Sequence, residues 1–203
     1  MTPPALASPS GGLPSAVRWA HLLHADRLRP GDSAVDATAG NGHDTLFLCH
    51  CVGEEGSVWA FDVQQAALTA TRSRLQQADI AESVYHLVHD GHEHLDRHLP
   101  ADLAPRACLF NLGYLPGSDK SVITETPRTL RAVQAALTCL APGGLLTIVV
   151  YPGHEGGAEE GRAIAEWASG LDPRAFEAQH LRPVNRAASP PECWAVWKRD
   201  RPA

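Results

Sequence analysis

Apolar and polar positions along the chain predict strands and helices in regular alternation. Short apolar runs that stop at a polar residue are typical of buried strands, whereas apolar residues spaced three and four apart are typical of amphipathic helices. The predicted strands lie within residues 33–40, 57–64, 83–90, 107–116, 145–153, 176–184 and 193–200. The predicted helices are residues 16–28, 43–52, 65–79, 129–144 and 158–171.

This order predicts an α/β fold. Strands that alternate with helices form a mostly parallel sheet with helices on both faces. Residues 145–153 are almost wholly apolar, as expected of a strand covered on both sides. No helix separates the last two of the seven strands, so these two should form a C-terminal antiparallel hairpin. Ligands of such sheets bind at the carboxyl ends of the strands.

The length of 203 residues suits one domain. We expect residues 1–14, which are rich in Pro, Ser and Gly, to be a disordered lead-in, and residues 15–203 to form the single domain. No apolar run is long enough to span a bilayer, and the N-terminus lacks the features of a signal peptide, so the predicted location is the cytoplasm. The five cysteines include no C-x-x-C pair, which argues against a disulfide framework and a zinc knuckle.

The net charge of −6 is unevenly distributed. Residues 1–96 have a balance of −7 and residues 97–203 a balance of +1. The total does not indicate a nucleic-acid-binding protein, but a local basic face is sufficient for one. The candidates for such a face are Lys120, Arg128, Arg131, Arg182 and Arg186.

The stretch "VDATAGNGHDT" reads as a strand that runs into a glycine turn. Asp36 ends the strand, and Gly40 and Gly42 let the backbone approach a ligand closely. Asp62 follows Gly40 by 22 residues, close to the spacing at which a carboxylate accepts hydrogen bonds from ribose hydroxyls. The pattern therefore predicts a nucleoside cofactor, with a purely structural glycine turn as the alternative.

Two nucleoside cofactors are compatible with this turn. The dinucleotide fingerprint needs a third glycine where this chain has Thr45. Asp44, at the start of the next helix, opposes a pyrophosphate but can receive an ammonium group. These residues favour S-adenosylmethionine over a dinucleotide.

The third predicted strand ends in a histidine-rich stretch. Asp90 and the backbone of His92 are placed to meet an adenine edge. The five histidines of this region also raise the question of a metal site: His86, His89, His92, His94 and His98. Their spacing straddles a strand end without a cysteine, so we predict no metal.

The fourth predicted strand leads into "FNLGYLPGSDK". An Asn at a strand end, followed by an aromatic residue and a proline, resembles the Asn-Pro-Pro-Tyr loop of amino-group methyltransferases. The amide oxygen of Asn111 can accept a hydrogen bond from a substrate nitrogen and aim its lone pair at a methyl group. Tyr114 can stack on a planar base. The alternative is a turn that only packs.

Four motifs in order give a specific resemblance over about residues 16–198. They are "DATAGNGHDT", "FNLGYLPGSDK", "YPGHEGG" and "SPPECWAVWK". Together they resemble the YtqB-like or MnmM-like family of Rossmann-like class I methyltransferases, whose older description is rRNA methylase. The resemblance implies S-adenosylmethionine as cofactor. It also implies N-methylation of the 5-aminomethyl group of wobble 2-thiouridine, in the anticodon stem-loop of tRNA.

The resemblance also implies site residues. It places Asn41, Asp44, Asp62, Gln64 and His92 with the cofactor, and Asn111, Tyr114 and Lys120 with the substrate. The full set predicted for the cofactor is Asp36, Gly40, Asn41, Gly42, Asp44, Thr45, Asp62, Gln64, Asp90, His92 and Asn111. Asn111 and Tyr114 are the predicted catalytic residues, and the predicted substrate contacts are Tyr114, Pro116, Lys120, Tyr151, His154 and Arg186. Two departures from the family pattern concern the fit of the substrate. Residues Gly117–Asp119 read "GSD", where the family is expected to have two glycines before the aspartate. The last predicted strand is less aliphatic than is usual in the family.

The predicted reaction needs alignment more than a strong base. His154 or Asp119 could relay a proton, or both could be plain loop residues. Three other functions stay open: methyl transfer to rRNA or a small molecule, NAD-dependent oxidoreduction, and cofactor binding without catalysis. A homodimer is also left open.

Overall fold

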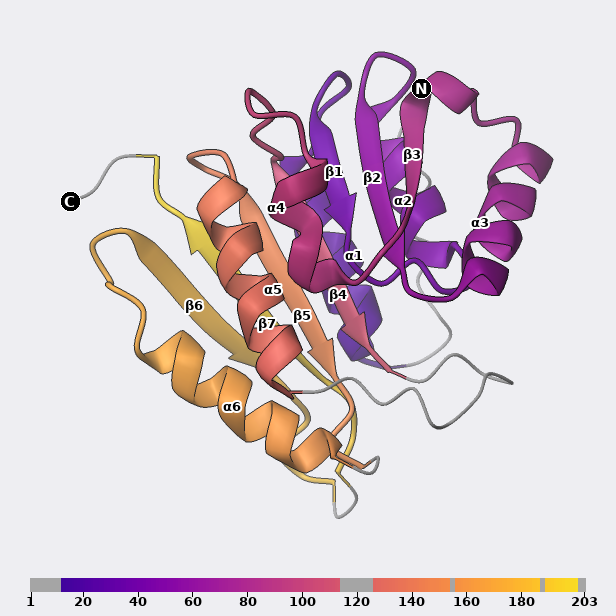
Figure 1. The fold of residues 1–203 in the computed structure, drawn as a ribbon. Coiled ribbons are helices and arrows are strands. Elements are labelled where there is room, and N and C mark those ends of the chain that lie inside the picture. Colours follow the sequence, from indigo (N-terminus) through magenta and orange to yellow (C-terminus); the bar gives the residue numbers. More distant parts are fainter. Residues whose placement is uncertain (1–11, 114–125, 154–155, 187–188, 201–203) are drawn as a thin grey trace.

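The computed structural model describes residues 12–113, 126–153, 156–186 and 189–200. Within these ranges the strands form one sheet of seven, in the order β3-β2-β1-β4-β5-β7-β6 (Figure 1). Their bounds are β1 Ser33–Asp36, β2 Ser57–Asp62, β3 Tyr85–His89, β4 Ala107–Leu112, β5 Leu145–Val150, β6 Phe176–Leu181 and β7 Glu192–Lys198. Neighbouring strands from β3 to β5 are parallel, and β7 runs antiparallel to both β5 and β6. The predicted α/β fold with a C-terminal antiparallel hairpin is confirmed.

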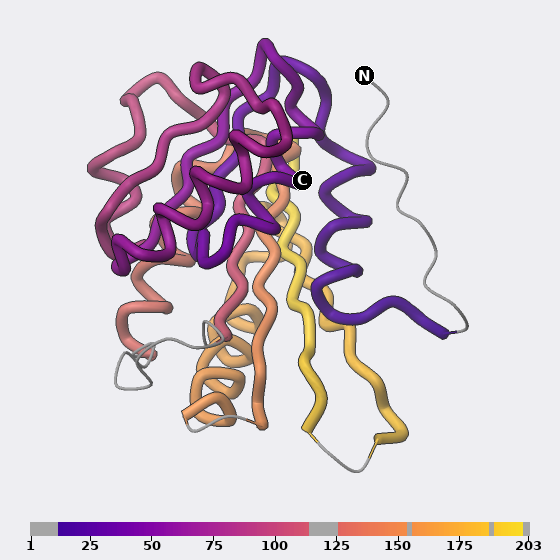
Figure 2. The backbone as a smooth tube through the Cα atoms, turned by 90° about the vertical axis from the view of Figure 1, so that its right-hand side faces the viewer, coloured from indigo at the N-terminus to yellow at the C-terminus, as the bar shows by residue number. Residues whose placement is uncertain are grey.

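Helices cover both faces of the sheet. Their bounds are α1 Ala16–Arg27, α2 His43–Val52, α3 Gln65–Gln77, α4 Leu95–His98, α5 Thr126–Cys139 and α6 Gly157–Ser169, with short 3-10 turns at Glu82–Val84 and His92–His94. Figure 1 shows α4, α5 and α6 in front of the sheet. Figure 2 shows α1 on the opposite side of the central strands from α5 and α6. The first strand is shorter than its predicted segment, because the chain leaves the sheet at Asp36 to make the glycine turn.

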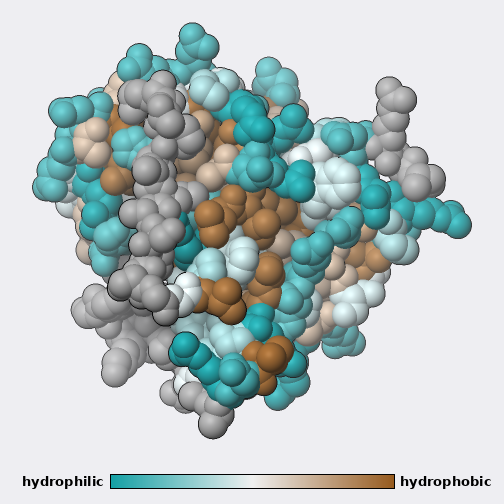
Figure 3. All heavy atoms as spheres, turned by 180° about the vertical axis from the view of Figure 1, so that it is seen from behind, coloured by the Kyte–Doolittle hydropathy of each residue, from teal (hydrophilic) through white to brown (hydrophobic). Residues whose placement is uncertain are grey.

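The core consists of two main apolar layers, one on each side of the sheet. Phe61, Phe110 and Ile148 belong to the layer under α5 and α6, whereas Leu48 and Leu109 belong to the layer under α2. Every residue of β5 is buried, which explains the continuous apolar run in its sequence. On the rear face, apolar residues lie in the middle and hydrophilic residues surround them (Figure 3).

Helix α1 belongs to this domain and packs on the rear of the sheet. Ser15 caps it, because the Ser15 hydroxyl accepts a hydrogen bond from the backbone N–H of Arg18 at 3.3 Å. Ala16 and Ala20 pack against Val149 of β5 and Cys193 of β7. The division into a lead-in at residues 1–14 and one domain stays a prediction, and residues 1–11 lie outside the described ranges.

No helix in the described part of the chain is long and apolar enough to cross a membrane.

Candidate active site

The glycine turn between β1 and α2 forms the floor of the candidate site. Gly40 and Gly42 have φ angles of 51° and 77°, in the left-handed region that favours glycine. The backbone N–H of Ala39 donates to the carbonyl of Phe61 at 2.8 Å, which ties the turn to the end of β2. A Cβ on Gly42 would lie 2.8 Å from Cα of Thr71, so α3 leaves no room for a side chain there.

Asp36 supports this turn from below. Its carboxylate is fully buried and accepts hydrogen bonds from the hydroxyl of Thr45 at 2.6 Å and the N–H of Thr38 at 3.1 Å. Burial, with the nearby charge of Asp44, raises the pKa of Asp36 to about 7. Asp36 and Thr45 have no exposed surface, so direct contact with a cofactor would require the turn to move.

The carboxylate of Asp62 lies at the carboxyl end of β2, beside the turn. One oxygen accepts from the N–H of Gly40 at 2.9 Å, and the other accepts from the N–H of Gln64 at 2.8 Å. From α3, Arg74 donates to the carbonyl of Asn41 at 2.6 Å, and Thr71 donates to the carbonyl of Gly40 at 3.1 Å. These contacts from β2 and α3 hold the turn beside Asp62, the carboxylate that the sequence predicts to bind ribose.

The end of β3 places Asp90 among histidines. Its carboxylate accepts hydrogen bonds from His94 at 3.0 Å and His98 at 2.8 Å, and these hold the pKa of Asp90 well below its usual range. His92 contacts the carbonyl of Ala37 at 3.2 Å through Nδ1, and burial lowers the pKa of its imidazole. Within the described ranges, no group of three or more His, Cys, Asp or Glu side chains is arranged to hold a metal ion.

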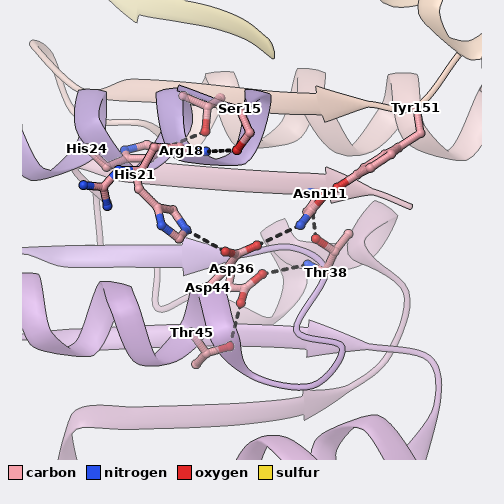
Figure 4. Close-up of polar contacts among 11 residues, drawn as sticks. Ser15, Arg18, His21, His24, Asp36, Thr38, Asp44, Thr45, Asn111 and Tyr151 are labelled. Atoms are coloured by element: carbon pink, nitrogen blue, oxygen red, sulfur yellow. Dashed lines mark hydrogen bonds and ion pairs between the residues drawn. The ribbon is translucent and has the colours of Figure 1, made fainter. Parts of the chain in front are cut away.

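The acceptor side of the site is a chain of hydrogen bonds that crosses three elements (Figure 4). Asn111, near the end of β4, donates from Nδ2 to Oδ2 of Asp44 at 3.0 Å. Its Oδ1 accepts from the hydroxyl of Tyr151 at 2.9 Å, and its backbone N–H donates to Thr38 Oγ1 at 2.8 Å. Burial raises the pKa of Tyr151, so its hydroxyl keeps the proton that it donates.

His21 completes this chain and was not among the predicted site residues. Its Nε2 donates to the second oxygen of Asp44 at 2.6 Å, and its ring stacks on Phe47 with centroids 4.0 Å apart. The only sequence signal was a histidine within the predicted first helix. Nothing in the spacing says which face of the sheet that helix covers.

The structure therefore brings together the predicted residues of four strand ends. Asn111 contacts both Asp44 and Tyr151 in one group, and Asp62 contacts both Gly40 and Gln64 in a second group. Arg186 is exposed in the segment between β6 and β7 and belongs to neither group. The remaining predicted residues, Tyr114, Pro116, Lys120 and His154, lie outside the described residues, as does Asp119.

These groups fit S-adenosylmethionine. Asp62 offers a carboxylate for a ribose diol beside a turn that places no side chain at Gly40 or Gly42. Two carboxylates, from Asp44 and Asp62, flank the turn, which suits a cofactor with an ammonium and a sulfonium better than a pyrophosphate. The assignment of individual residues to the cofactor stays a prediction.

Comparison with known families decides the class. The sequence model of a family described as "Putative rRNA methylase" matches residues 58–197. The chain belongs to this family. A "tRNA (mnm(5)s(2)U34)-methyltransferase, chloroplastic" from Arabidopsis thaliana is 37% identical to this methylase over 186 residues, 88% of this chain and 68% of the relative.

Solved structures agree with the family. The solved structure of a "putative rRNA-methylase" from Clostridium thermocellum has 34% identity and a TM-score of 0.88, and the match covers 93% of this chain and all of that one. A "putative methyltransferase" from Streptococcus mutans, solved in complex with S-adenosylhomocysteine (SAH), has 35% identity and a TM-score of 0.82, with 92% and 99% covered. This methylase is therefore a class I methyltransferase that uses S-adenosylmethionine, as predicted.

Proposed function

We propose that the protein transfers a methyl group to the nitrogen of the 5-aminomethyl group of wobble 2-thiouridine in tRNA, within the anticodon stem-loop. The observation that carries the proposal is the fixed amide of Asn111 at the carboxyl end of β4. When ionised, Asp44 can only accept a hydrogen bond, so the atom of Asn111 that faces it must be the donor, Nδ2. The amide oxygen of Asn111, Oδ1, then faces Tyr151.

The oxygen of Asn111 has capacity for a substrate amine. A carbonyl oxygen has two lone pairs, and the Tyr151 hydroxyl occupies one of them. The other can accept a hydrogen bond from an amine N–H, which orients the lone pair of that nitrogen. The relative from Arabidopsis is named as a methyltransferase for uridine 34 of tRNA, which supports an amine on a wobble uridine as the acceptor.

The chemistry needs little more from the protein than this alignment. When bound, S-adenosylmethionine supplies a methyl group that is already activated on a sulfonium. The residues around Asn111 hold the acceptor in a near-attack position, an effect that supplies about 7–11 kcal/mol in favourable intramolecular reactions. An alkyl amine attacks in its neutral form, and a partly buried site favours that form.

Substitution of Asn111 tests the acceptor role. Asn111→Ala should lower kcat and leave the affinity for S-adenosylmethionine nearly unchanged, because the proposed partner of Asn111 is the amine. Calorimetry with the cofactor and single-turnover assays with tRNA separate these two quantities. Turnover at the wild-type level in a folded variant would exclude the lone-pair-orienting role.

The substrate is tested by presenting competing acceptors. The protein is incubated with labelled S-adenosylmethionine and separate pools of tRNA, rRNA and small metabolites. We expect label in tRNA alone. Label in rRNA or in a metabolite would replace the proposed substrate, and binding of the cofactor without transfer to any pool would favour a binding module.

The basic face and the cellular location belong to the same proposal. Arg182 follows β6 directly, and the register Val150↔Glu192 places the connection between β6 and β7 at the edge where β5 ends. Exposed arginines there can contact RNA phosphates near Asn111. The cytoplasm and a homodimer stay predictions, and the relative from Arabidopsis is named as chloroplastic.

A further inference from the structure

We propose that His21 is a positioning residue for methyl transfer: by holding Asp44, it fixes the side-chain amide of Asn111 in the orientation that receives the acceptor amine. The inference rests on the proposed role of Asn111 as the acceptor contact. It adds a residue from α1, an element that carries no residue predicted for the site.

The geometry leaves His21 little freedom. Its side chain is 17% exposed and that of Asp44 is 8% exposed, so the 2.6 Å contact between them is mostly shielded from water. Stacking on Phe47, at an interplanar angle of 10°, fixes the plane of the imidazole. A shielded charge-assisted hydrogen bond of this kind is stronger and more directional than an exposed one.

Asp44 passes this constraint on to Asn111. Its two carboxylate oxygens are divided between His21 and Asn111, one hydrogen bond to each. Without His21, the carboxylate can rotate about its side-chain torsions, and Nδ2 of Asn111 loses a fixed partner. Tyr151 alone does not define the amide, because a hydroxyl can donate to Oδ1 or accept from Nδ2.

A second histidine of α1 provides the contrast. His24 is fully buried one turn further along and contacts Thr147 Oγ1 at 2.8 Å, deep between α1 and β5. His24 fastens α1 to the sheet and His21 fastens it to α2, but only the contact of His21 continues to Asn111 (Figure 4). Their variants can therefore separate a positioning role from simple docking of the helix.

The experiment compares four variants in single-turnover assays with tRNA. His21→Phe keeps an aromatic ring against Phe47 but has no N–H donor, and His21→Leu is a second variant without a donor should the first not fold. His21→Gln retains a donor. Thr147→Val removes the hydrogen-bond partner of His24. It should weaken the packing of α1 and leave the hydrogen bonds from His21 through Asp44 to Asn111 intact.

We expect His21→Phe to lower the rate of methyl transfer by about tenfold to a hundredfold, the scale of a small misplacement of a reacting group. The affinity for S-adenosylmethionine should fall by less than the rate, because Asp44 keeps its carboxylate beside the turn, and His21→Gln should recover most of the rate. Thr147→Val should lower the melting temperature and leave the rate unchanged. In an Asn111→Ala background, His21→Phe should have no further effect on the rate, because the two residues act as one unit.

Two results would overturn the proposal. One is an unchanged rate in folded His21→Phe or His21→Leu. The other is an equal slowing by His21→Phe in the wild-type and Asn111→Ala backgrounds, which would mean that His21 does not act through Asn111.

A measurement that needs no turnover separates this proposal from the proposed function. The NMR signals of the Asn111 side-chain amide, assigned by their loss in Asn111→Ala, should move or broaden in His21→Phe but not in Thr147→Val. If the wild type does not methylate tRNA and the signals change in this way, the substrate proposal fails and the positioning role stands. If the signals do not respond to His21→Phe, the positioning role fails.

Discussion

At the scale of single residues, the site depends on carboxylates that have different tasks. Asp62 is partly exposed beside the glycine turn, whereas Asp36 is enclosed and Asp44 is shared between two side chains. The sequence assigned Asp62 to ribose and Asp44 to an ammonium group, but it did not show that Asp36 is enclosed or that two side chains share Asp44. Burial and hydrogen-bond partners, which depend on the packed structure, make the distinction.

Asp62→Ala should weaken the binding of S-adenosylmethionine. A hydrogen bond to a charged group contributes about 1.5–3 kcal/mol, which corresponds to an affinity loss of about tenfold or more. Calorimetry measures the loss, and thermal melting without cofactor serves as the control, because Asp62 also binds the backbone of Gly40 and Gln64. Full affinity in a folded variant would remove Asp62 from the ribose site.

Asp36 should make stability depend on pH. Its pKa is raised from 3.8 to about 7 in the folded protein, so between these values the folded state binds a proton that the unfolded state releases. The free energy of unfolding should therefore fall as pH rises from about 4 to about 7, by up to about 1.4 kcal/mol per pH unit. Asp36→Asn, which keeps similar hydrogen bonds to Thr38 and Thr45, should remove this slope in denaturant titrations. An identical slope in wild type and variant would mean that Asp36 does not titrate in this range.

At the scale of elements, the contact between the glycine turn and α3 sets the shape of the site. Gly42→Ala should destabilise the fold and weaken cofactor binding, because the added Cβ meets the backbone of Thr71 at 2.8 Å. Gly31→Ala is a matched control, since Gly31 has a φ of 91° but nothing within 4 Å of the new Cβ. The left-handed conformation alone costs about 1–2 kcal/mol. Equal losses of unfolding free energy in the two variants would show that contact with α3 does not matter.

Much of the fold could be predicted from the sequence, because its periodicities are clear. The alternation of strands and helices predicted the parallel sheet, and the absence of a helix between β6 and β7 predicted the final hairpin. Asn111 could be placed at the carboxyl edge because it ends a strand. The partner of Asp44 could not be predicted, because His21 precedes it by 23 residues and helical periodicity does not say where α1 packs. Likewise, the hydrogen bonds of Asp90 to His94 and His98 depend on a short turn that the pattern of apolar residues does not define.

At the scale of the whole molecule, the proposed tRNA substrate requires a local basic face on a chain whose net charge is −6. The affinity for an anticodon stem-loop should fall as the salt concentration rises. In a plot of log affinity against log salt concentration, each phosphate contact should contribute about 0.7–0.9 to the slope. Arg186→Ala should flatten that slope by about one unit if Arg186 meets a phosphate. Titrations at several salt concentrations measure it, and Arg174→Ala, an exposed arginine before β6 at the opposite end of that strand, is the control. Equal slopes for wild type and Arg186→Ala would place the RNA path elsewhere.

The central claim is methyl transfer to a primary amine on a tRNA wobble base, and analysis of the product nucleosides tests it most directly. Purified protein and S-adenosylmethionine are incubated with tRNA that carries 5-aminomethyl-2-thiouridine, and with matched tRNA that has unmodified 2-thiouridine at the same position. After digestion, mass spectrometry should show conversion of the aminomethyl nucleoside to its methylaminomethyl form and no methylation of the matched tRNA. A methyl group on any other nucleoside, or equal methylation of both tRNAs, would contradict the account.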